Sequence, residues 1–207
     1  LKEKYTNKQW ARDIVTGAPY TKTDINKIDC AVFSVQKGFG LPGGLSVIIA
    51  NDKCIEKARQ LEEKDVIIGS YHNFVTLADN ADKFQTAITP NVMNIYLLGK
   101  VCEVLNNKGI NEVRKETEEK AKIIYDAFVD GDNIVPFVKD PKDRSQTTIV
   151  LEIKDGNSTK LKDLLLENNI VIGQGYKGYK EKQLRIGNFP MHTKKDIEKI
   201  VKVLKQD

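Results

Sequence analysis

The sequence predicts an α/β protein of two units, each with its own short strands and amphipathic helices. The first half alternates β-rich runs with helical runs, and a turn-rich loop, QKGFGLPGG, separates its two clearest strands. After a loop marked by Pro136 and Pro141, strands and helices alternate again. At 207 residues, the chain is long enough for two compact units of this kind.

In the first half, the short, β-rich runs CAVFS at residues 30–34 and LSVIIA at residues 45–50 predict strands. Asp52 opens the amphipathic segment DKCIEKARQLEEK, which predicts a helix with this aspartate at its start as the cap. The polar stretch 69–90 predicts a long loop, and loops of that length usually carry function or contact a partner. Asp13 stands at the head of a short β-prone segment, RDIVTGAPY.

From residue 91 onwards, helical spacing of apolar residues predicts a helix to about residue 107 and a second from about 111 to 130. Further elements follow in the same way: strands at 147–153, 170–173 and 183–188, and helices at 158–168 and 194–205. We therefore place a domain boundary between residues 107 and 108, with 108–207 forming a small C-terminal α/β domain.

Charge and hydropathy exclude several classes of function. The 33 basic and 29 acidic residues leave a net charge of +4, but lysines alternate with acids, as in RKETEEKAK, so no nucleic-acid-binding patch is expected. No apolar stretch approaches the roughly 20 residues that cross a bilayer, and the first residues lack the apolar core of a signal peptide. We expect a cytoplasmic protein with no nucleic-acid or membrane partner.

The three cysteines, Cys30, Cys54 and Cys102, have spacings that fit neither a disulfide framework nor a metal site. We expect them to be reduced and structural, and we expect no bound metal. Only five of the basic residues are arginines, so few groups are available for bidentate binding of a carboxylate or phosphate.

Lys37 lies in the glycine-rich loop directly after an apolar strand, between Gln36 and Gly38. Desolvation at such a place makes a neutral lysine amine available for Schiff-base chemistry. Alone, such a lysine more often faces water, and Asp13 alone would be a cap or a turn former. Together, a lysine that binds an aldehyde cofactor and a carboxylate that pairs with a pyridine nitrogen are two parts of a pyridoxal phosphate site.

Four motifs carry a resemblance to a known family: DIVTGAPY, DCAVFSVQKGFGLPGGLSVII, QTAITPNVMNIYLLGKVCEVL and QLRIGNFPMHT. The sequence resembles the class V, fold type I pyridoxal phosphate aminotransferases, most closely the phosphoserine aminotransferase-like group. The resemblance begins at Tyr5 and continues to the C-terminus. It implies that residues 1–107 are the C-terminal part of a large, mixed-sheet cofactor domain and that 108–207 are the small domain.

The resemblance implies a role for each matching residue. Lys37 would form the Schiff base with pyridoxal phosphate and then move a proton between the substrate and the cofactor, while Asp13 would pair with the pyridine nitrogen. Gln36 and Thr16 match positions close to the cofactor. Thr89 resembles the position whose hydroxyl reaches the cofactor phosphate of the neighbouring subunit, which implies a homodimer with a shared active site.

Arg185, in LRIGN, matches the small-domain arginine that binds the substrate α-carboxylate, a role that suits a planar fork of donors. Phosphoserine aminotransferases carry a phosphate-binding His-Arg pair before this arginine, whereas this sequence has GQGYKGYKEKQ. Lys177 or Lys180 could bind a substrate phosphate there as a point charge. Otherwise the substrate carries no phosphate.

The resemblance implies a pyridoxal phosphate-dependent transaminase that acts on an amino acid and a 2-oxo acid, namely phosphoserine and 2-oxoglutarate in serine biosynthesis. A class V aminotransferase for a non-phosphorylated amino acid is the first alternative. A cysteine desulfurase is the second, and the placement of the cysteines disfavours it. A truncated or non-catalytic relative is the third, because the family's phosphate loop and cofactor-stacking aromatic residue precede Asp13. This last departure implies that the chain alone is inactive.

Overall fold

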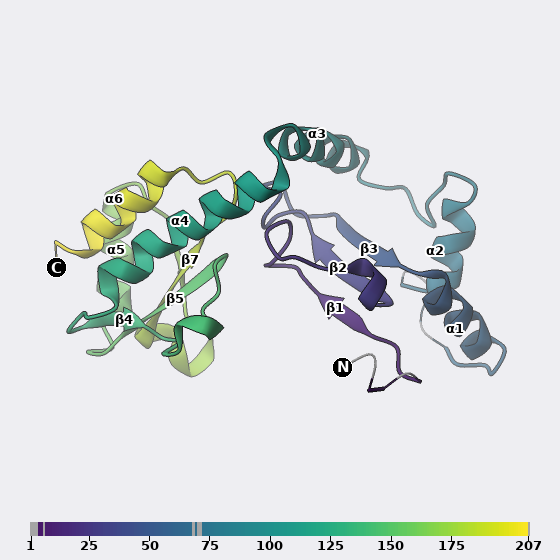
Figure 1. The fold of residues 1–207 in the computed structure, drawn as a ribbon, viewed down its shortest axis with the longest axis horizontal. Helices are drawn as coiled ribbons and strands as arrows, with labels where there is room; N and C mark the ends of the chain where they lie inside the picture. The colour runs from purple at the N-terminus through teal and green to yellow at the C-terminus, as the bar shows by residue number, and fades with distance from the viewer. Residues whose placement is uncertain (1–3, 6, 68, 70–71, 207) are drawn as a thin grey trace. The chain divides into compact units, whose positions relative to one another are not determined.

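The computed structural model describes residues 4–5, 7–67, 69 and 72–206, and the chain divides into two compact units, each with its own sheet (Figure 1). Unit 1 comprises residues 1–36 and 41–100, and unit 2 comprises residues 37–40 and 101–207. The predicted α/β class is confirmed. The predicted boundary between residues 107 and 108 stays a prediction. In the described ranges, no helix combines the length and apolarity needed to cross a membrane.

Unit 1 is built on a three-stranded sheet in the order β1-β2-β3 (Figure 1). The strands are Ala11–Asp13, Cys30–Ser34 and Ser46–Ala50, and β1 runs parallel to β2 while β3 runs antiparallel to it. Because β1 and β2 are parallel, their carboxyl ends lie at the same edge of the sheet, where Asp13 is opposite Val32. The loop that begins after β2 therefore starts at the same edge as Asp13.

Asp13 closes a strand, so the prediction that it heads a β-prone segment is wrong. The chain turns directly after β1, where the N–H groups of Gly17 and Ala18 both donate to the carbonyl oxygen of Ile14, at 3.0 and 2.8 Å. The apolar residues that follow Asp13 in the sequence therefore belong to a turn.

Asp29 is buried and holds the start of the β1–β2 pair. Its carboxylate accepts hydrogen bonds from the Trp10 backbone N–H at 2.8 Å and from the Asn51 side-chain amide at 3.0 Å. The backbone N–H groups of Asp29 and Cys30 donate to the Trp10 carbonyl at 2.8 and 3.1 Å. A slip of β1 by one residue would separate these groups, so Asp29 fixes the register of the pair.

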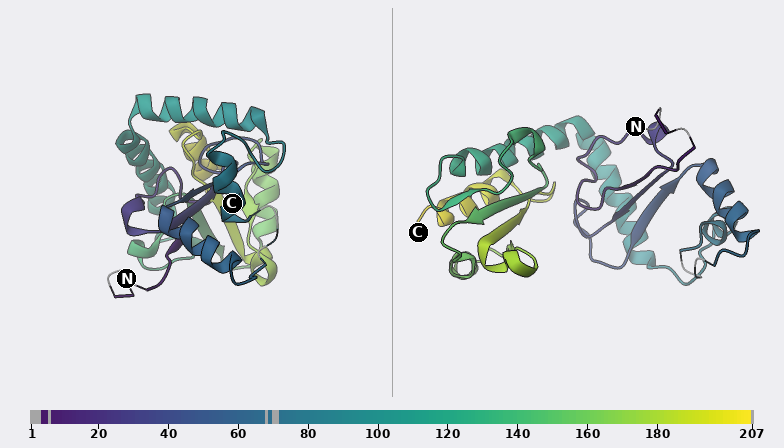
Figure 2. Two further views of the ribbon diagram at one scale, coloured as in Figure 1. Left: turned by 90° about the vertical axis from the view of Figure 1, so that its right-hand side faces the viewer. Right: turned by 90° about the horizontal axis from the view of Figure 1, so that it is seen from below.

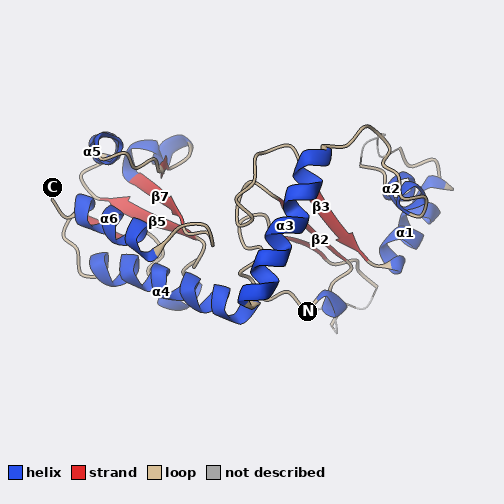
Figure 3. Ribbon diagram, turned by 90° about the horizontal axis from the view of Figure 1, so that it is seen from above, coloured by secondary structure: helices blue, strands red, loops and turns tan. Residues whose placement is uncertain are grey.

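Helices α1 (Asp52–Glu62) and α2 (Phe74–Ala81) pack against each other in unit 1 (Figure 3). Asn51 caps α1 by accepting the Cys54 N–H at 3.0 Å, so the prediction that Asp52 is the cap is wrong by one residue. The prediction of one loop over 69–90 is also wrong, because α2 lies inside it, capped by Asn73. Two residues of that stretch, Ser70 and Tyr71, lie outside the described residues.

Helix α3 (Val92–Lys108) follows, and the Asn91 side chain accepts the Asn94 N–H at 3.1 Å at its start. Gly109, with φ of 86°, is the only residue between α3 and α4 (Ile110–Phe128). A positive φ of this kind favours glycine, which explains why α3 ends and α4 begins at this position.

Unit 2 is a four-stranded antiparallel sheet in the order β4-β5-β7-β6. The strands are Ile134–Pro136, Thr148–Ile153, Gln183–Gly187 and Gly173–Gln174. Helices α4, α5 (Ser158–Glu167) and α6 (Lys194–Leu204) share an apolar core with the inward side chains of β5 and β7, and the right-hand view of Figure 2 shows the face of the sheet opposite the helices. The core places Arg185 on β7, between inward-facing Leu184 and Ile186.

Two strands of unit 2 differ from the prediction. The sequence did not predict β4, because three residues are too short to show a period. The strand predicted at 170–173 is replaced by β6, because Asn169 adopts a positive φ of 59° and the Ile170 N–H still bonds to the Leu165 carbonyl of α5 at 2.9 Å. The chain therefore becomes free to pair with β7 only at Gly173.

We predict that Asp29→Ala lowers the free energy of unfolding of unit 1 by about 1.5–3 kcal/mol, the range for losing hydrogen bonds to a charged group. Trp10 is the only tryptophan of the sequence, so its fluorescence during a urea titration reports on this unit. Asp52→Ala is the matched control, because an exposed acid in the first turn of a helix contributes at most about 1 kcal/mol. Equal losses in the two variants would contradict the assigned role of Asp29.

Candidate active site

The loop between β2 and β3 carries Gln36 and Lys37. Val35 anchors its start, because this residue is fully buried, its carbonyl accepts the Leu41 N–H at 3.2 Å, and its N–H donates to the Leu45 carbonyl at 3.2 Å. The Lys37 carbonyl accepts the Gly40 N–H at 2.9 Å, and the Lys37 side chain is half-buried. Within the described ranges, the Lys37 amine takes part in no hydrogen bond or ion pair, so it is chemically available.

Asp13 and Thr16 lie at the end of β1 and in the turn after it. The Asp13 Oδ1 accepts the Val15 N–H at 2.8 Å, which orients the carboxylate. No hydrogen bond to the other oxygen, Oδ2, occurs among the residues that the structure describes. One carboxylate oxygen can therefore accept a hydrogen bond from a ligand, while Thr16 is exposed beside it in the sequence.

A hollow of about 870 Å³ in unit 1 brings two of the predicted residues together. Gln36 lines it from the loop after β2, and Thr89 lines it from the segment that leads into α3. His72, which precedes α2, also lines it. The volume is in the range of small-molecule and cofactor sites. The structure thus places Gln36 and Thr89 of one chain at the same hollow.

Arg185 is held on β7 by three neighbours. Its Nε donates to the Gln174 carbonyl at 2.6 Å, and its guanidinium carbon lies 3.8 Å from the centre of the Tyr176 ring. Gly173 is opposite Arg185 in the β6–β7 pair, and a β-carbon built there would lie 3.2 Å from Nη2. The terminal nitrogens have no hydrogen-bond partner in the described part of the chain. They form a preoriented fork of the kind that binds a carboxylate through two parallel bonds.

Lys177 begins the 3₁₀ helix Lys177–Lys182, directly after Tyr176, and its side chain is exposed. Lys180 lies one turn further along and is also exposed. Both lysines are therefore on the segment whose Tyr176 contacts Arg185. The sequence did not identify Tyr176 as part of a site, because the stacking depends on the short β6–β7 pairing, which has no periodic signal.

The predicted site residues divide between the units. Four of them, Asp13, Thr16, Gln36 and Thr89, lie in unit 1, and three, Lys37, Lys177 and Arg185, lie in unit 2. Over the described ranges, no hydrogen bond or ion pair joins any two of the seven. Their assignment to one catalytic site is therefore a prediction from the sequence.

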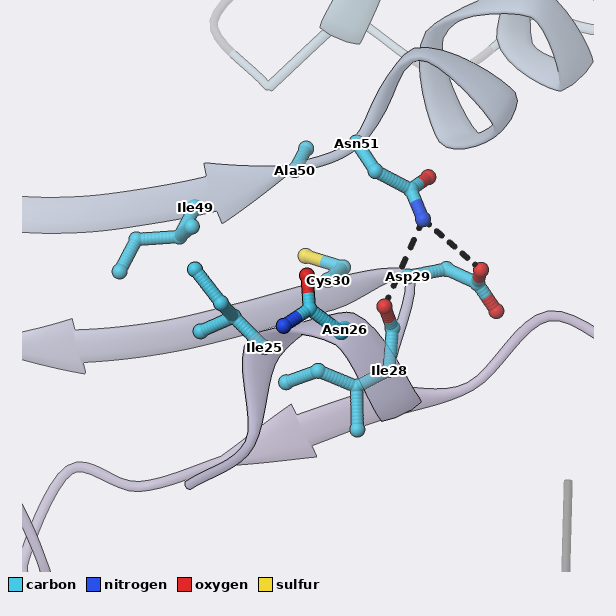
Figure 4. A pocket seen from close by; sticks show the side chains of 8 residues that line it. All are labelled: Ile25, Asn26, Ile28, Asp29, Cys30, Ile49, Ala50 and Asn51. Carbon is cyan, nitrogen blue, oxygen red and sulfur yellow. Dashed lines mark hydrogen bonds between the residues drawn. The ribbon is translucent and has the colours of Figure 1, made fainter. Parts of the chain in front are cut away.

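A second, smaller hollow of about 170 Å³ lies where β2 begins and β3 ends (Figure 4). Figure 4 shows the Asn51 amide directed towards Asp29 and the Ile28 carbonyl, with the Cys30 sulfur close by. None of the predicted site residues lines it. Two of its polar side chains, Asp29 and Asn51, are paired with each other in holding the start of the sheet, so we assign it a structural role.

The three cysteines do not offer an activated nucleophile. Burial raises the pKa of the Cys30, Cys54 and Cys102 thiols, which disfavours the thiolate. All three are free. The described residues also contain no cluster of His, Cys, Asp and Glu side chains that could hold a metal ion.

The sequence matches a known protein family over most of its length. The family model described as "Aminotransferase class-V" matches residues 5–200. The chain belongs to the class V aminotransferases. Among curated members of this family, it is 26% identical over 194 residues to phosphoserine aminotransferase from Rhodococcus opacus (strain B4) and 28% identical over 192 residues to that from Corynebacterium glutamicum (strain R). These alignments cover 93% and 92% of this chain but 52% and 51% of the relatives.

Solved structures of aminotransferases are also similar. A phosphoserine aminotransferase from Cytophaga hutchinsonii ATCC 33406 has a TM-score of 0.93 and 40% identity, over 100% of this chain and 57% of that one. An alanine–glyoxylate aminotransferase from Nostoc sp. shares the fold, with a TM-score of 0.85 at 18% identity over 98% of this chain and 54% of that one. These likenesses confirm the predicted fold type I architecture. The chain spans about half the length of the curated relatives it matches.

Proposed function

We propose that the protein that contains this chain is a pyridoxal phosphate-dependent aminotransferase of the cytoplasm, which moves an amino group from phosphoserine to 2-oxoglutarate in serine biosynthesis. The observation that carries the proposal is the match to the class V family over residues 5–200. Lys37 supports it, because this lysine lies on a loop closed by the Leu41–Val35 hydrogen bond and its amine has no partner among the described residues. Relatives named phosphoserine aminotransferase support this choice of substrate. A non-phosphorylated amino acid is the alternative substrate.

The residues present fit pyridoxal phosphate. The hollow of about 870 Å³ that Gln36 lines has the volume of a small-molecule site, and Lys37 and Asp13 are not among its lining residues. Asp13 offers a carboxylate oxygen at the edge where β1 ends. When bound, pyridoxal phosphate supplies an electron sink that stabilises negative charge at the substrate α-carbon.

The side chains of this chain supply binding and proton transfer. Lys37 would hold the cofactor through its Nζ and then, as a free amine, would take the proton from the substrate α-carbon and deliver it to the cofactor. Asp13 would accept a hydrogen bond from the ring N–H through the oxygen that Val15 does not use, which keeps that nitrogen protonated. Gln36 and Thr16 would contact the cofactor.

Thr89 would bind, through its hydroxyl, the phosphate of the cofactor that the neighbouring subunit holds. We include a homodimer with a shared active site in the proposal, because the family position that Thr89 matches acts on the neighbouring subunit's cofactor.

Arg185 would bind the α-carboxylate of the amino acid or the 2-oxo acid through its two terminal nitrogens. Tyr176 and the Gln174 carbonyl already fix the plane of the guanidinium, so little rotational freedom is lost when a carboxylate binds.

Lys177 or Lys180 would attract a substrate phosphate as a point charge on the adjoining segment. This arrangement replaces a bidentate arginine with a lysine, which gives charge without a fixed geometry.

We predict that Lys37→Ala abolishes the near-ultraviolet absorbance band that the full-length protein gains when it binds pyridoxal phosphate, because the covalent link to the lysine is lost. Lys53→Ala is the control, since Lys53 is an exposed lysine of α1, and it should keep the band. Persistence of the same band in Lys37→Ala would refute the assignment of Lys37.

We predict that Arg185→Gln raises the KM for the amino donor by at least about tenfold, the effect of losing 1.5–3 kcal/mol of charged hydrogen bonds. Tyr176→Leu should raise it by about two- to fivefold, since cation–π contacts at exposed sites contribute about 0.5–1 kcal/mol. Tyr176→Phe is the conservative control and should resemble the unaltered enzyme. Steady-state kinetics of all three variants would test this, and an unchanged KM in Arg185→Gln would exclude carboxylate binding by Arg185.

A further inference from the structure

A lysine is buried in unit 2, away from the residues proposed for catalysis. Lys120, on α4, is 4% exposed, and its Nζ donates to the carbonyl oxygens of Phe189 at 2.9 Å and His192 at 2.7 Å. Burial lowers the pKa of its ammonium, and nearby Glu116 opposes that effect. Charged donors form strong hydrogen bonds when they are desolvated, so Lys120 ties the two carbonyls to α4.

The segment that Lys120 binds, residues 188–193, connects β7 to α6. Asn188 begins it and is fully buried, and its side-chain amide donates to the carbonyls of Thr117 on α4 and Gln146, both at 2.8 Å. The His192 N–H donates to the Phe189 carbonyl at 3.0 Å, which closes a turn within the segment. Two buried polar side chains, Lys120 and Asn188, therefore hold the segment at both ends.

Met191 is at the exposed part of this segment, and it covers the loop that carries Lys37. Residues 37–40 belong to unit 2, as the 188–193 segment does. A β-carbon built on Gly40 would overlap the Met191 methyl group, so the methionine packs directly on the Gly40 backbone. Gly40 also adopts a φ of 66°, and its N–H bonds to the Lys37 carbonyl. Met191 therefore packs on the residue whose N–H closes the turn at Lys37.

We propose that Lys120 is a positioning residue for the Lys37 loop, acting through the 188–193 segment and the contact of Met191 with Gly40. Lys120 touches neither substrate nor cofactor in this role. Removing its ammonium leaves the His192 carbonyl without its charged donor and releases the segment, and the Gly40–Lys37 turn then loses its cover. The consequence for catalysis rests on the proposed function of Lys37, but the mechanical coupling does not.

Amide hydrogen exchange of the full-length protein without added cofactor tests the coupling. In Lys120→Met, which keeps the length of the side chain, the amides of Gly40 and His192 should exchange at least about fivefold faster, the factor that corresponds to ~1 kcal/mol. The amide of Leu184, in the core of the sheet, should keep its rate. Lys122→Met is the matched control, because Lys122 is an exposed lysine of α4 paired with Asp126.

A second variant separates the two steps. Met191→Ala removes the contact with Gly40 and leaves both bonds of Lys120, so it should speed exchange at Gly40 and not at His192. If Lys120→Met does not fold, Met191→Ala still tests whether the contact of Met191 with Gly40 restrains the Lys37 loop. An unchanged rate at Gly40 in Met191→Ala, or faster exchange at His192 without any change at Gly40 in Lys120→Met, overturns the proposal.

The kcat and KM of Lys120→Met test the effect on catalysis separately from the coupling that hydrogen exchange measures. If Lys37 acts as proposed, Lys120→Met should lower kcat by about fivefold and leave the KM for the amino donor within about twofold, because Arg185 is held by β7 and Tyr176 independently. A raised KM with unchanged kcat would contradict a role through Lys37. The exchange result stands whether or not the protein is an aminotransferase.

Discussion

The carboxylate of Asp29 meets the backbone of Trp10 where β1 and β2 begin, and the geometry of the candidate site depends on this contact. It sets the register of a parallel pair whose other end carries Asp13. Because β1 is only three residues long and exposed along its length, hydrophobic burial contributes little to its placement. The hydrogen bonds at Asp29 therefore determine where the Asp13 carboxylate lies relative to the start of the loop after β2.

Buried polar side chains also fix the position of one segment in unit 2. Apolar residues of α4, α5, α6 and the sheet form a continuous core there, and such packing fixes the elements. The connecting segment 188–193 cannot be placed in this way, and Lys120 and Asn188 hold it through backbone carbonyls instead. The strand that carries Asp13 in unit 1 and the connecting segment 188–193 in unit 2 are thus located by directional bonds from buried polar side chains.

Much of this arrangement could be predicted from the sequence, since β2 and β5 have clear apolar runs, β7 alternates polar and apolar residues, and α4 and α6 have strong helical periods. Lys37 was recognisable because it follows a buried strand in a glycine-rich loop. By contrast, α2 is short and its first turn depends on the Asn73 cap, while β4 and β6 are too short for a period to show. Tyr176 could not be recognised, since its contact with Arg185 depends on the short pairing of β6 with β7. Lys120 could not be recognised, since its partners lie about 70 residues further along the chain and nothing in the sequence distinguishes it from the exposed lysines.

Borohydride reduction followed by peptide mass mapping would identify the lysine that binds pyridoxal phosphate. The full-length protein would be incubated with pyridoxal phosphate, reduced to trap any lysine adduct, and digested. The account predicts that the phosphopyridoxyl group is found on the peptide that contains Lys37, at close to one group per chain. A group distributed over exposed lysines, or concentrated on another residue, would contradict it.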